Sequence, residues 1–174
     1  IKPTTRRNLM MGILVGFAAG IGLVFLLNQL DRTVRSPENL ERYGIPLIGM
    51  VPSFHAKPKK GKFILSMIEH PKSPLSEAIR DLRTSLGFAK PDTRIKTLLI
   101  TSSGPQEGKS SISSNLAIAE AQAGKKVILL DCDLRRPVIN KVFGFPRKPG
   151  FTELVIGRAE ITEVVRKTGI EGLS

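Results

Sequence analysis

The stretch LLITSSGPQEGKSS, residues 98–111, is typical of an apolar strand that leads into a phosphate-binding loop and then into a helix. Residues 95–101 predict the strand, and residues 109–123, closed by Gly124, predict the helix. In such a loop the backbone N–H groups and the helix N-terminus face the phosphates of a nucleotide. The sequence therefore predicts a nucleotide-binding site.

Individual loop residues have specific expected roles in this chemistry. Gly108 is expected to let the backbone approach closely, Lys109 to reach the β- and γ-phosphates of ATP, and the Ser110 hydroxyl to bind Mg²⁺. The common pattern has its first glycine at the position of Ser103, whereas this chain has it one residue later, at Gly104. The predicted nucleotide-binding residues of the loop are Gly104, Pro105, Gln106, Glu107, Gly108, Lys109, Ser110 and Ser111.

A second motif, VILLDCDLRRP at residues 127–137, places two carboxylates after another apolar strand. Open parallel sheets bind ligands at the carboxyl ends of their strands, so Asp131 and Asp133 are candidate Mg²⁺ ligands and, with Lys109, candidate catalytic residues. Arg135 is a candidate nucleotide contact through phosphate. The alternative is an acidic turn with ordinary capping bonds, but the neighbouring phosphate loop favours the functional interpretation.

The remaining patterns predict the fold class and the classes of partner. Alternating strands and helices predict an α/β fold, a parallel sheet with flanking helices. Residues 76–89 predict a helix capped by Ser76, and residues 45–51 a short or edge strand.

A net charge of +12 favours anionic partners such as nucleotide or a membrane surface. With no Trp and one Tyr, stacking on nucleic acid is poorly supported, and no nucleic-acid partner is expected.

The N-terminal region predicts a transmembrane helix over residues 9–30. No charged residue occurs between Asn8 and Leu30, and a helix of that length spans about 35 Å, enough for a bilayer core. The flanking charges do not settle its orientation. Because ATP is cytosolic, the residues after Leu30 are expected to be cytoplasmic, at the bacterial inner membrane.

Taken together, the motifs resemble those of the bacterial tyrosine autokinases fused to a chain-length determinant, the polysaccharide co-polymerases of capsule and exopolysaccharide export. The resemblance covers nearly the whole chain and includes a Pro-containing phosphate loop, the Asp-x-Asp-x-Arg segment and a helical stretch at residues 150–165. It also includes a Glu-x-x-Arg-x-x-Arg motif at Glu77, Arg80 and Arg83, which local helix salt bridges alone would otherwise explain.

This resemblance implies a domain division and partners. Residues 1–8 correspond to the end of an extracytoplasmic segment, 9–30 to the membrane helix, 31–75 to a juxtamembrane segment with a basic linker, and 76–174 to the N-terminal part of a P-loop NTPase-type tyrosine kinase domain. Glu77, Arg80 and Arg83 are implied to mediate a ring-like homo-oligomer with phosphorylation between subunits. The polysaccharide polymerase and export machinery is the further implied partner.

The resemblance also implies a longer parent protein. A further apolar strand ending in Asp and a tyrosine-rich tail are expected after Ser174, and a first membrane helix and most of an extracytoplasmic domain before Ile1. Two alternatives remain open. One is a partitioning or cell-division ATPase, although that class carries a lysine at the position of Gly104. The other is a non-catalytic co-polymerase whose nucleotide controls its assembly.

Overall fold

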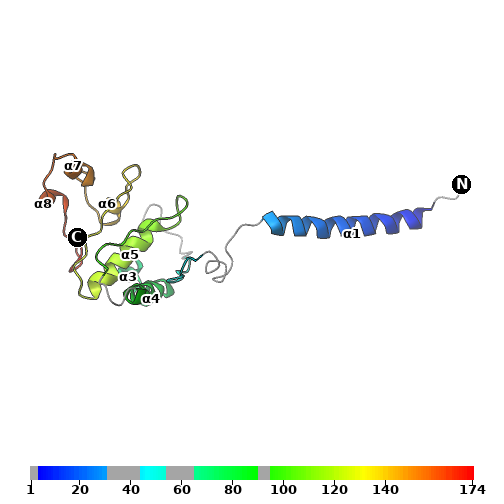
Figure 1. Ribbon diagram of the computed structural model, residues 1–174, viewed down its shortest axis with the longest axis horizontal. Helices are drawn as coiled ribbons and strands as arrows, with labels where there is room; N and C mark the ends of the chain where they lie inside the picture. The colour runs from blue at the N-terminus through cyan, green and yellow to red at the C-terminus, as the bar shows by residue number, and fades with distance from the viewer. Residues whose placement is uncertain (1–3, 31–43, 54–64, 90–94) are drawn as a thin grey trace. The chain divides into compact units, whose positions relative to one another are not determined.

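The computed structural model describes residues 4–30, 44–53, 65–89 and 95–174. The chain divides into two compact units, residues 1–47 and residues 48–174. The first unit contains α1 (Thr5–Leu30). The described helices of the second unit are α3 (Ser66–Glu69), α4 (Pro74–Ala89), α5 (Lys109–Gln122), α6 (Ile139–Val142), α7 (Phe151–Val155) and α8 (Ile161–Val164) (Figure 1).

Helix α1 is the predicted apolar helix, and it begins at Thr5, four residues before the expected start at Leu9. It has 26 residues, with a mean hydropathy of 2.4 in its most apolar window, and none of its residues is buried. By length and composition it is sufficient to cross a membrane. Its fully exposed apolar surface is what a lipid-facing helix requires.

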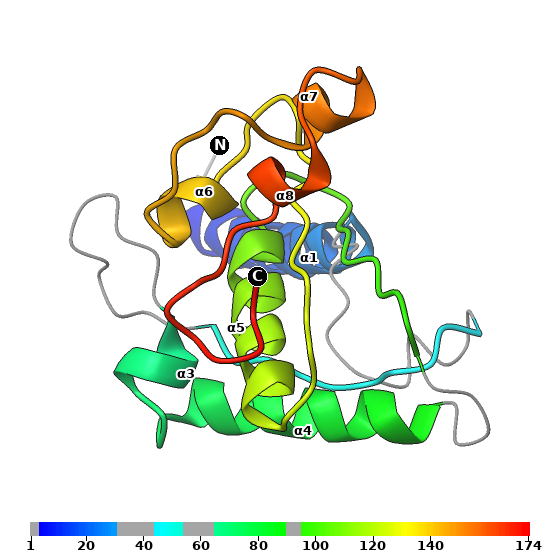
Figure 2. The same ribbon diagram turned by 90° about the vertical axis from the view of Figure 1, so that its left-hand side faces the viewer.

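Helices α4 and α5 form the core of the second unit. Ile79 of α4 and Ile118 of α5 are completely inaccessible to solvent, and Met67 of α3 packs in the same cluster. Apolar side chains at helical spacing on α4 face the apolar side of α5, which runs across it in Figure 2. This packing fixes α5, and therefore the loop from which α5 begins.

The start of α4 differs in its capping residue from the sequence prediction. The helix begins at Pro74, and the Ser73 hydroxyl accepts a hydrogen bond from the Ser76 N–H at 3.2 Å. Ser73 is therefore the N-cap, with proline in the first helical position, a favourable arrangement at a helix N-terminus. Ser76 lies inside the helix, so the prediction that Ser76 caps it was wrong.

Helix α5 has the bounds that the sequence indicates. Gly108 precedes it with φ +87°, and the Gly108 carbonyl accepts the first hydrogen bond of the helix, from Ile112 N–H at 2.8 Å. At the other end Gly124 has φ +82° and donates its N–H to the Ala121 carbonyl at 2.8 Å. Glycine is favoured at both positions because a side chain strains this left-handed conformation.

The predicted strands at residues 45–51, 95–101 and 127–130 are not assigned as strands in the described part of the chain. One isolated parallel bridge joins Val127 to Leu173, with Val127 N–H bonded to the Gly172 carbonyl at 2.8 Å. Its parallel direction agrees with the predicted sheet, but the sheet itself is not confirmed. A strand exists only through hydrogen bonds to a neighbour, which an apolar sequence pattern does not supply.

The C-terminal part carries the short elements of the second unit. The helical stretch expected at residues 150–165 is present as α7 and α8, separated by a turn. The basic linker around residues 57–62, and with it much of the predicted segment 31–75, lies outside the described residues.

Candidate nucleotide-binding site

The predicted phosphate loop is a tight turn at the N-terminus of α5. Gln106 has φ +63°, unlike the other non-glycine residues that the structure describes, and Gly108 has φ +87°. A non-glycine residue in this region is strained and is held there by its surroundings. Two left-handed residues in a short stretch bend the backbone sharply, and such bends gather N–H groups into an anion-binding concavity.

Lys109 folds back over this turn. Its Nζ atom donates hydrogen bonds to the Ser102 Oγ atom at 2.9 Å and to the Gly104 carbonyl oxygen at 3.0 Å. The Ser102 hydroxyl donates to the same carbonyl at 2.8 Å. The ammonium group is therefore held within the loop, where a phosphate bound by the loop amides would meet it.

Glu107 also turns back into the loop. Its Oε2 atom accepts the Gly104 N–H at 2.9 Å, and the Ser103 hydroxyl donates to its carboxylate at 3.1 Å. These contacts lower the pKa of Glu107, with the Gly104 N–H as the largest cause. The Glu107 carboxylate thus links the two ends of the loop through hydrogen bonds.

The first turn of α5 places the predicted Mg²⁺ ligand Ser110 directly after Lys109, half-buried. Pro105 and Gln106 are exposed at the tip of the loop. The Ser111 carbonyl accepts a hydrogen bond from Asn115 Nδ2 at 2.9 Å, which anchors this turn to a buried residue. The loop side chains and the helix N-terminus thus come together as the sequence predicts.

The acidic turn contains more internal hydrogen bonds than the sequence indicates. Asp131 Oδ2 accepts the N–H groups of Val138 and Ile139, at 2.9 and 3.0 Å, and so caps α6. Its Oδ1 accepts the Asp133 N–H at 3.1 Å, while Asp133 Oδ1 accepts the Arg136 N–H at 2.9 Å. The capping interpretation therefore describes the hydrogen bonds that this turn makes.

A role in metal binding needs ligands besides this pair. Within the described residues, no three His, Cys, Asp or Glu side chains are grouped to hold a metal ion. Mg²⁺ is typically held by one or two carboxylates together with substrate phosphates and water, so Asp131, Asp133 and the Ser110 hydroxyl suit it as a partial ligand set. In Figures 1 and 2 the segment after α5 turns back along this helix, toward the end at which the loop lies. Arg135 is exposed in the same turn.

A cavity of about 420 Å³ lies beside Asp131 and away from the phosphate loop. Its lining is mainly apolar and includes Ile128, Phe143, Phe151 and Leu173. None of the predicted loop residues lines it. The phosphate loop lies outside this cavity, whereas Asp131 of the acidic turn borders it.

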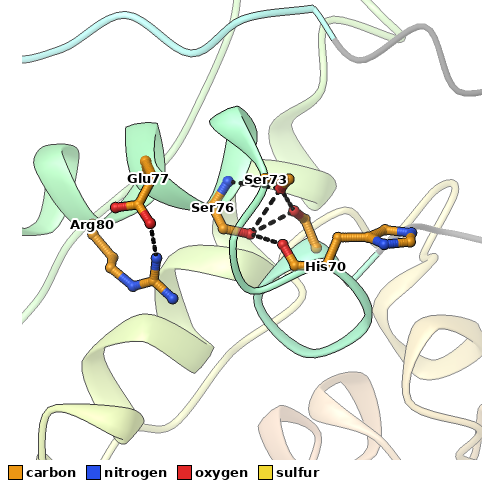
Figure 3. Close-up of polar contacts among 6 residues, drawn as sticks. His70, Ser73, Ser76, Glu77 and Arg80 are labelled. Carbon is orange, nitrogen blue, oxygen red and sulfur yellow. Dashed lines mark hydrogen bonds and ion pairs between the residues drawn. The ribbon is translucent and has the colours of Figure 1, made fainter.

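The Glu-x-x-Arg-x-x-Arg motif lies on α4, and its residues make two kinds of contact. Glu77 and Arg80 form an ion pair at 2.7 Å, visible in Figure 3, with Glu77 well exposed. Arg83 instead reaches α5 and donates to the Ala119 carbonyl oxygen at 3.1 Å. The motif thus has an exposed part and a part that fixes α4 against α5.

Buried hydroxyl groups hold the start of α4 in place. Ser66 and Ser76 are both completely buried, and their Oγ atoms are 2.7 Å apart. Ser76 also donates to the His70 carbonyl at 2.8 Å, and Ser73 completes the group (Figure 3). These hydrogen bonds satisfy buried polar atoms. They also hold the N-terminus of α4, the helix that carries Glu77 and Arg80.

Sequence reasoning missed Ser102 and Ser103. Both hydroxyls bond within the loop, Ser102 to Gly104 and Ser103 to Glu107. Three consecutive hydroxyl residues at the end of an apolar run, Thr101 to Ser103 just before a glycine, are the signal that could have identified them. Local hydrogen bonding of this kind is common for serine in turns.

No family model matches the chain. Over 185 residues, covering 99% of the chain, it is 31% identical to a Klebsiella pneumoniae protein described as a candidate tyrosine-protein kinase in the cps region. It is 30% identical over 189 residues, again 99% of the chain, to the tyrosine-protein kinase etk of Escherichia coli (strain K12). The chain spans about a quarter of the length of these relatives, 26% in each case.

The solved structure of the kinase domain of Escherichia coli tyrosine kinase ETK resembles this fold. The two superpose with a TM-score of 0.72 at 32% sequence identity, over 81% of this chain and 58% of that one. The chain is therefore a homologue of the bacterial tyrosine-protein kinases and matches a segment of them.

Proposed function

We propose that the protein is part of an ATP-dependent protein-tyrosine autokinase that regulates the chain length and export of a capsular polysaccharide or exopolysaccharide. The observation that carries the proposal is the loop at the N-terminus of α5, in which Lys109 is already held by Ser102 and Gly104. The homology to tyrosine-protein kinases supports the reaction type. The cps region named for the Klebsiella relative supports the link to polysaccharide.

In the proposed reaction the chain positions ATP and neutralises its charge. Lys109 leaves the Gly104 carbonyl to contact the β- and γ-phosphates, and the loop amides bind the phosphate oxygens. Mg²⁺ would be held by Ser110 and by the acidic turn, and it would offset the negative charge of the transferring phosphoryl group. Arg135, exposed beside the acids, adds positive charge where that group leaves.

The acidic turn serves the acceptor side of the reaction. Asp131 is fixed by three backbone N–H groups, whereas Asp133 accepts one. Asp133 is therefore better placed to accept the proton of an attacking tyrosine hydroxyl, and Asp131 to hold the turn and bind metal. One tyrosine, Tyr43, occurs among the 174 residues, so other acceptors belong to another segment or subunit.

The remaining parts of the proposal concern location and assembly. Helix α1 anchors the protein in the bacterial inner membrane, with the second unit in the cytoplasm where ATP is available. The exposed Glu77–Arg80 pair is a contact between subunits of a ring-like homo-oligomer. The export and polymerase machinery is the partner that this arrangement would regulate.

The test compares Lys109→Met with Lys126→Met. Lys126 is an exposed lysine just beyond the opposite end of α5, so its variant controls for loss of charge. Lys109→Met is expected to abolish ATP binding by the chain and tyrosine phosphorylation of the protein expressed from its whole reading frame. Undiminished phosphotyrosine in that variant would contradict the proposal.

A non-catalytic co-polymerase, whose nucleotide controls its assembly, is the second candidate. It predicts nucleotide-dependent assembly, seen by analytical ultracentrifugation, without phosphotyrosine in mass spectra. The partitioning ATPases are disfavoured by glycine at position 104, where they carry lysine.

A further inference from the structure

We propose that Glu107 is a positioning residue of the phosphate loop, and that Gly104 is glycine because the Glu107 carboxylate returns to it. The inference rests on the proposed nucleotide site and deepens it. It assigns a task to a side chain that the loop pattern leaves unspecified, and it accounts for the displaced glycine of this loop.

The carboxylate closes a short turn. Its Oε2 atom accepts the Gly104 N–H at 2.9 Å. The Ser103 hydroxyl donates to Oε1 at 3.1 Å and lies 3.3 Å from Oε2. Between these partners lies Gln106, whose φ of +63° is unfavourable for a side chain. The hydrogen bonds of Glu107 stabilise the turn that contains this strained residue.

Both peptide groups that flank Gly104 are held, each from a different side. The N–H of Gly104 bonds to Glu107, and the carbonyl of Gly104 accepts from Ser102 Oγ at 2.8 Å and from Lys109 Nζ at 3.0 Å. Gly104 takes part in both sets of hydrogen bonds. Loss of the Glu107 contact is therefore expected to make the Gly104 carbonyl, which accepts the Lys109 ammonium, less well ordered. Glu107 therefore acts on phosphate binding through Lys109 and the backbone.

The space around Gly104 explains why glycine stands there. A Cβ atom added to Gly104 would lie 3.1 Å from Glu107 Oε1 and 3.4 Å from Glu107 Cδ. Gly104 is not among the glycines with positive φ, so its backbone conformation does not itself demand glycine. It is the Glu107 carboxylate that crowds this position, and a larger residue requires the carboxylate to shift from its place. Ser103, which replaces the glycine of the common pattern, supplies the hydroxyl that bonds this carboxylate.

The charge of Glu107 is consistent with this task. The Gly104 N–H and the hydroxyls of Ser102 and Ser103 lower its pKa, so the carboxylate is ionised at neutral pH. Ionised acceptors form stronger hydrogen bonds than neutral ones. Both carboxylate oxygens bond to loop donors, which assigns Glu107 to holding the loop rather than to binding Mg²⁺.

The test uses the whole 174-residue chain, purified in detergent, and a two-by-two set of variants. These are the wild type, Gly104→Ala, Glu107→Ala and the double variant, with Glu107→Gln as the conservative change. Glu163→Ala is the matched control, because Glu163 Oε2 accepts the Glu160 N–H at 2.7 Å with the same spacing but at α8. Two quantities are measured: the Kd for a fluorescent ATP analogue with Mg²⁺, and amide hydrogen exchange of residues 98–111 without nucleotide.

Glu107→Ala is expected to speed exchange in the loop and to raise the Kd about tenfold, whereas Glu163→Ala changes neither. Glu107→Gln keeps an oxygen that can accept the Gly104 N–H, so its Kd lies between those of wild type and Glu107→Ala. Gly104→Ala raises the Kd in the wild type but adds little in the Glu107→Ala background, because the crowding is then relieved.

Unchanged loop exchange in Glu107→Ala would overturn the inference, whatever the binding result. Additive effects of Gly104→Ala and Glu107→Ala would equally overturn the stated reason for Gly104. If the wild type fails to bind the analogue while Glu107→Ala still speeds loop exchange, the proposed nucleotide site fails and the structural task of Glu107 stands.

Discussion

Arg83 of α4 donates a hydrogen bond to the main-chain carbonyl oxygen of Ala119 in α5, at 3.1 Å. Ala119 is completely buried, and α5 is the helix that begins at the phosphate loop. Arg83 therefore ties the proposed oligomerisation motif to the helix that begins at the proposed nucleotide site, in addition to the apolar packing between α4 and α5.

The first prediction separates the two arginines of that motif. Arg83→Ala is expected to lower the free energy of unfolding by about 1 kcal/mol, since a hydrogen bond between helices is lost. Arg80→Ala is expected to change it by less than about 0.5 kcal/mol, because its ion pair with Glu77 is largely exposed. Urea unfolding followed by circular dichroism measures both.

The same two variants also test the proposed contact between subunits. Both are expected to reduce self-association in sedimentation velocity, with Arg80→Ala doing so at unchanged stability. Equal destabilisation by the two substitutions would contradict this division of roles between Arg80 and Arg83.

A second prediction concerns Asn115, whose side chain is buried in α5. Its Oδ1 accepts the Met67 N–H at 3.0 Å, and its Nδ2 donates to the Ser111 carbonyl at 2.9 Å. Asn115→Leu leaves the buried Met67 N–H without this acceptor, so it is expected to cost about 1–3 kcal/mol of stability. Thermal unfolding measures the loss. Ser113→Ala, at a half-buried position on the same helix, serves as the control and is expected to cost much less.

A third prediction divides the roles of the two acids. Asp131→Ala removes the acceptor of the Val138 and Ile139 N–H groups and is expected to destabilise the second unit by about 1 kcal/mol, as loss of a helix cap does. Asp133→Asn keeps an oxygen for the Arg136 N–H and is expected to leave stability unchanged.

Asp133→Asn is nevertheless expected to lower tyrosine phosphorylation of the whole protein strongly, because an amide accepts no proton. Unfolding curves and phosphotyrosine mass spectrometry on the same preparations separate the two effects. Full phosphorylation by Asp133→Asn would remove it from the proposed proton transfer.

A fourth prediction follows from the lowered pKa of Glu107. Its pKa in the folded loop lies below the usual glutamate value of 4.5, so the ionised carboxylate is favoured by folding. The stabilisation of the loop is fully present above that value and is lost as pH falls through the lower, folded pKa. Loop exchange, corrected for the intrinsic pH dependence of amide exchange, is therefore expected to rise only below pH 4.5 in the wild type.

Glu107→Ala is expected to remove this pH dependence from the loop. Glu153, whose pKa is lowered chiefly by the Gly150 N–H, provides an internal reference at α7. Exchange at α7 is expected to keep its own acid transition in the Glu107→Ala variant. Loss of both transitions together would indicate global unfolding rather than a local event at the loop.

Much of the local structure followed from sequence patterns alone. The charge-free run after Asn8 predicted α1, and the helical spacing of Ile79, Leu82 and Leu86 predicted α4 within two residues. Gly108 and Gly124 marked the ends of α5. These helices and their ends depend mainly on residues close together in the chain, so local sequence patterns predict them.

The capping residue of α4 and the strands were less predictable. Ser73 and Ser76 are both plausible caps, and the structure separates them because Ser73 Oγ accepts the Ser76 N–H, whereas Ser76 is buried inside the helix against Ser66. The apolar segment 127–130 pairs with residues far along the chain: Val127 N–H bonds to the Gly172 carbonyl and Leu129 N–H to the Ser174 carbonyl, each at 2.8 Å. Sheet formation depends on such distant partners, which periodicity does not reveal.

Residue patterns alone indicate an apolar helix, a phosphate loop at the start of α5, and an acidic turn after an apolar run. The contacts of these residues come from the folded chain: Lys109 bonds to Ser102 and Gly104, Asp131 to the start of α6, and Arg83 to Ala119. The physical reason is that motifs record residue types at fixed spacing. Hydrogen bonds between side chains and distant backbone atoms depend on how the helices pack, which becomes definite only when the chain is folded.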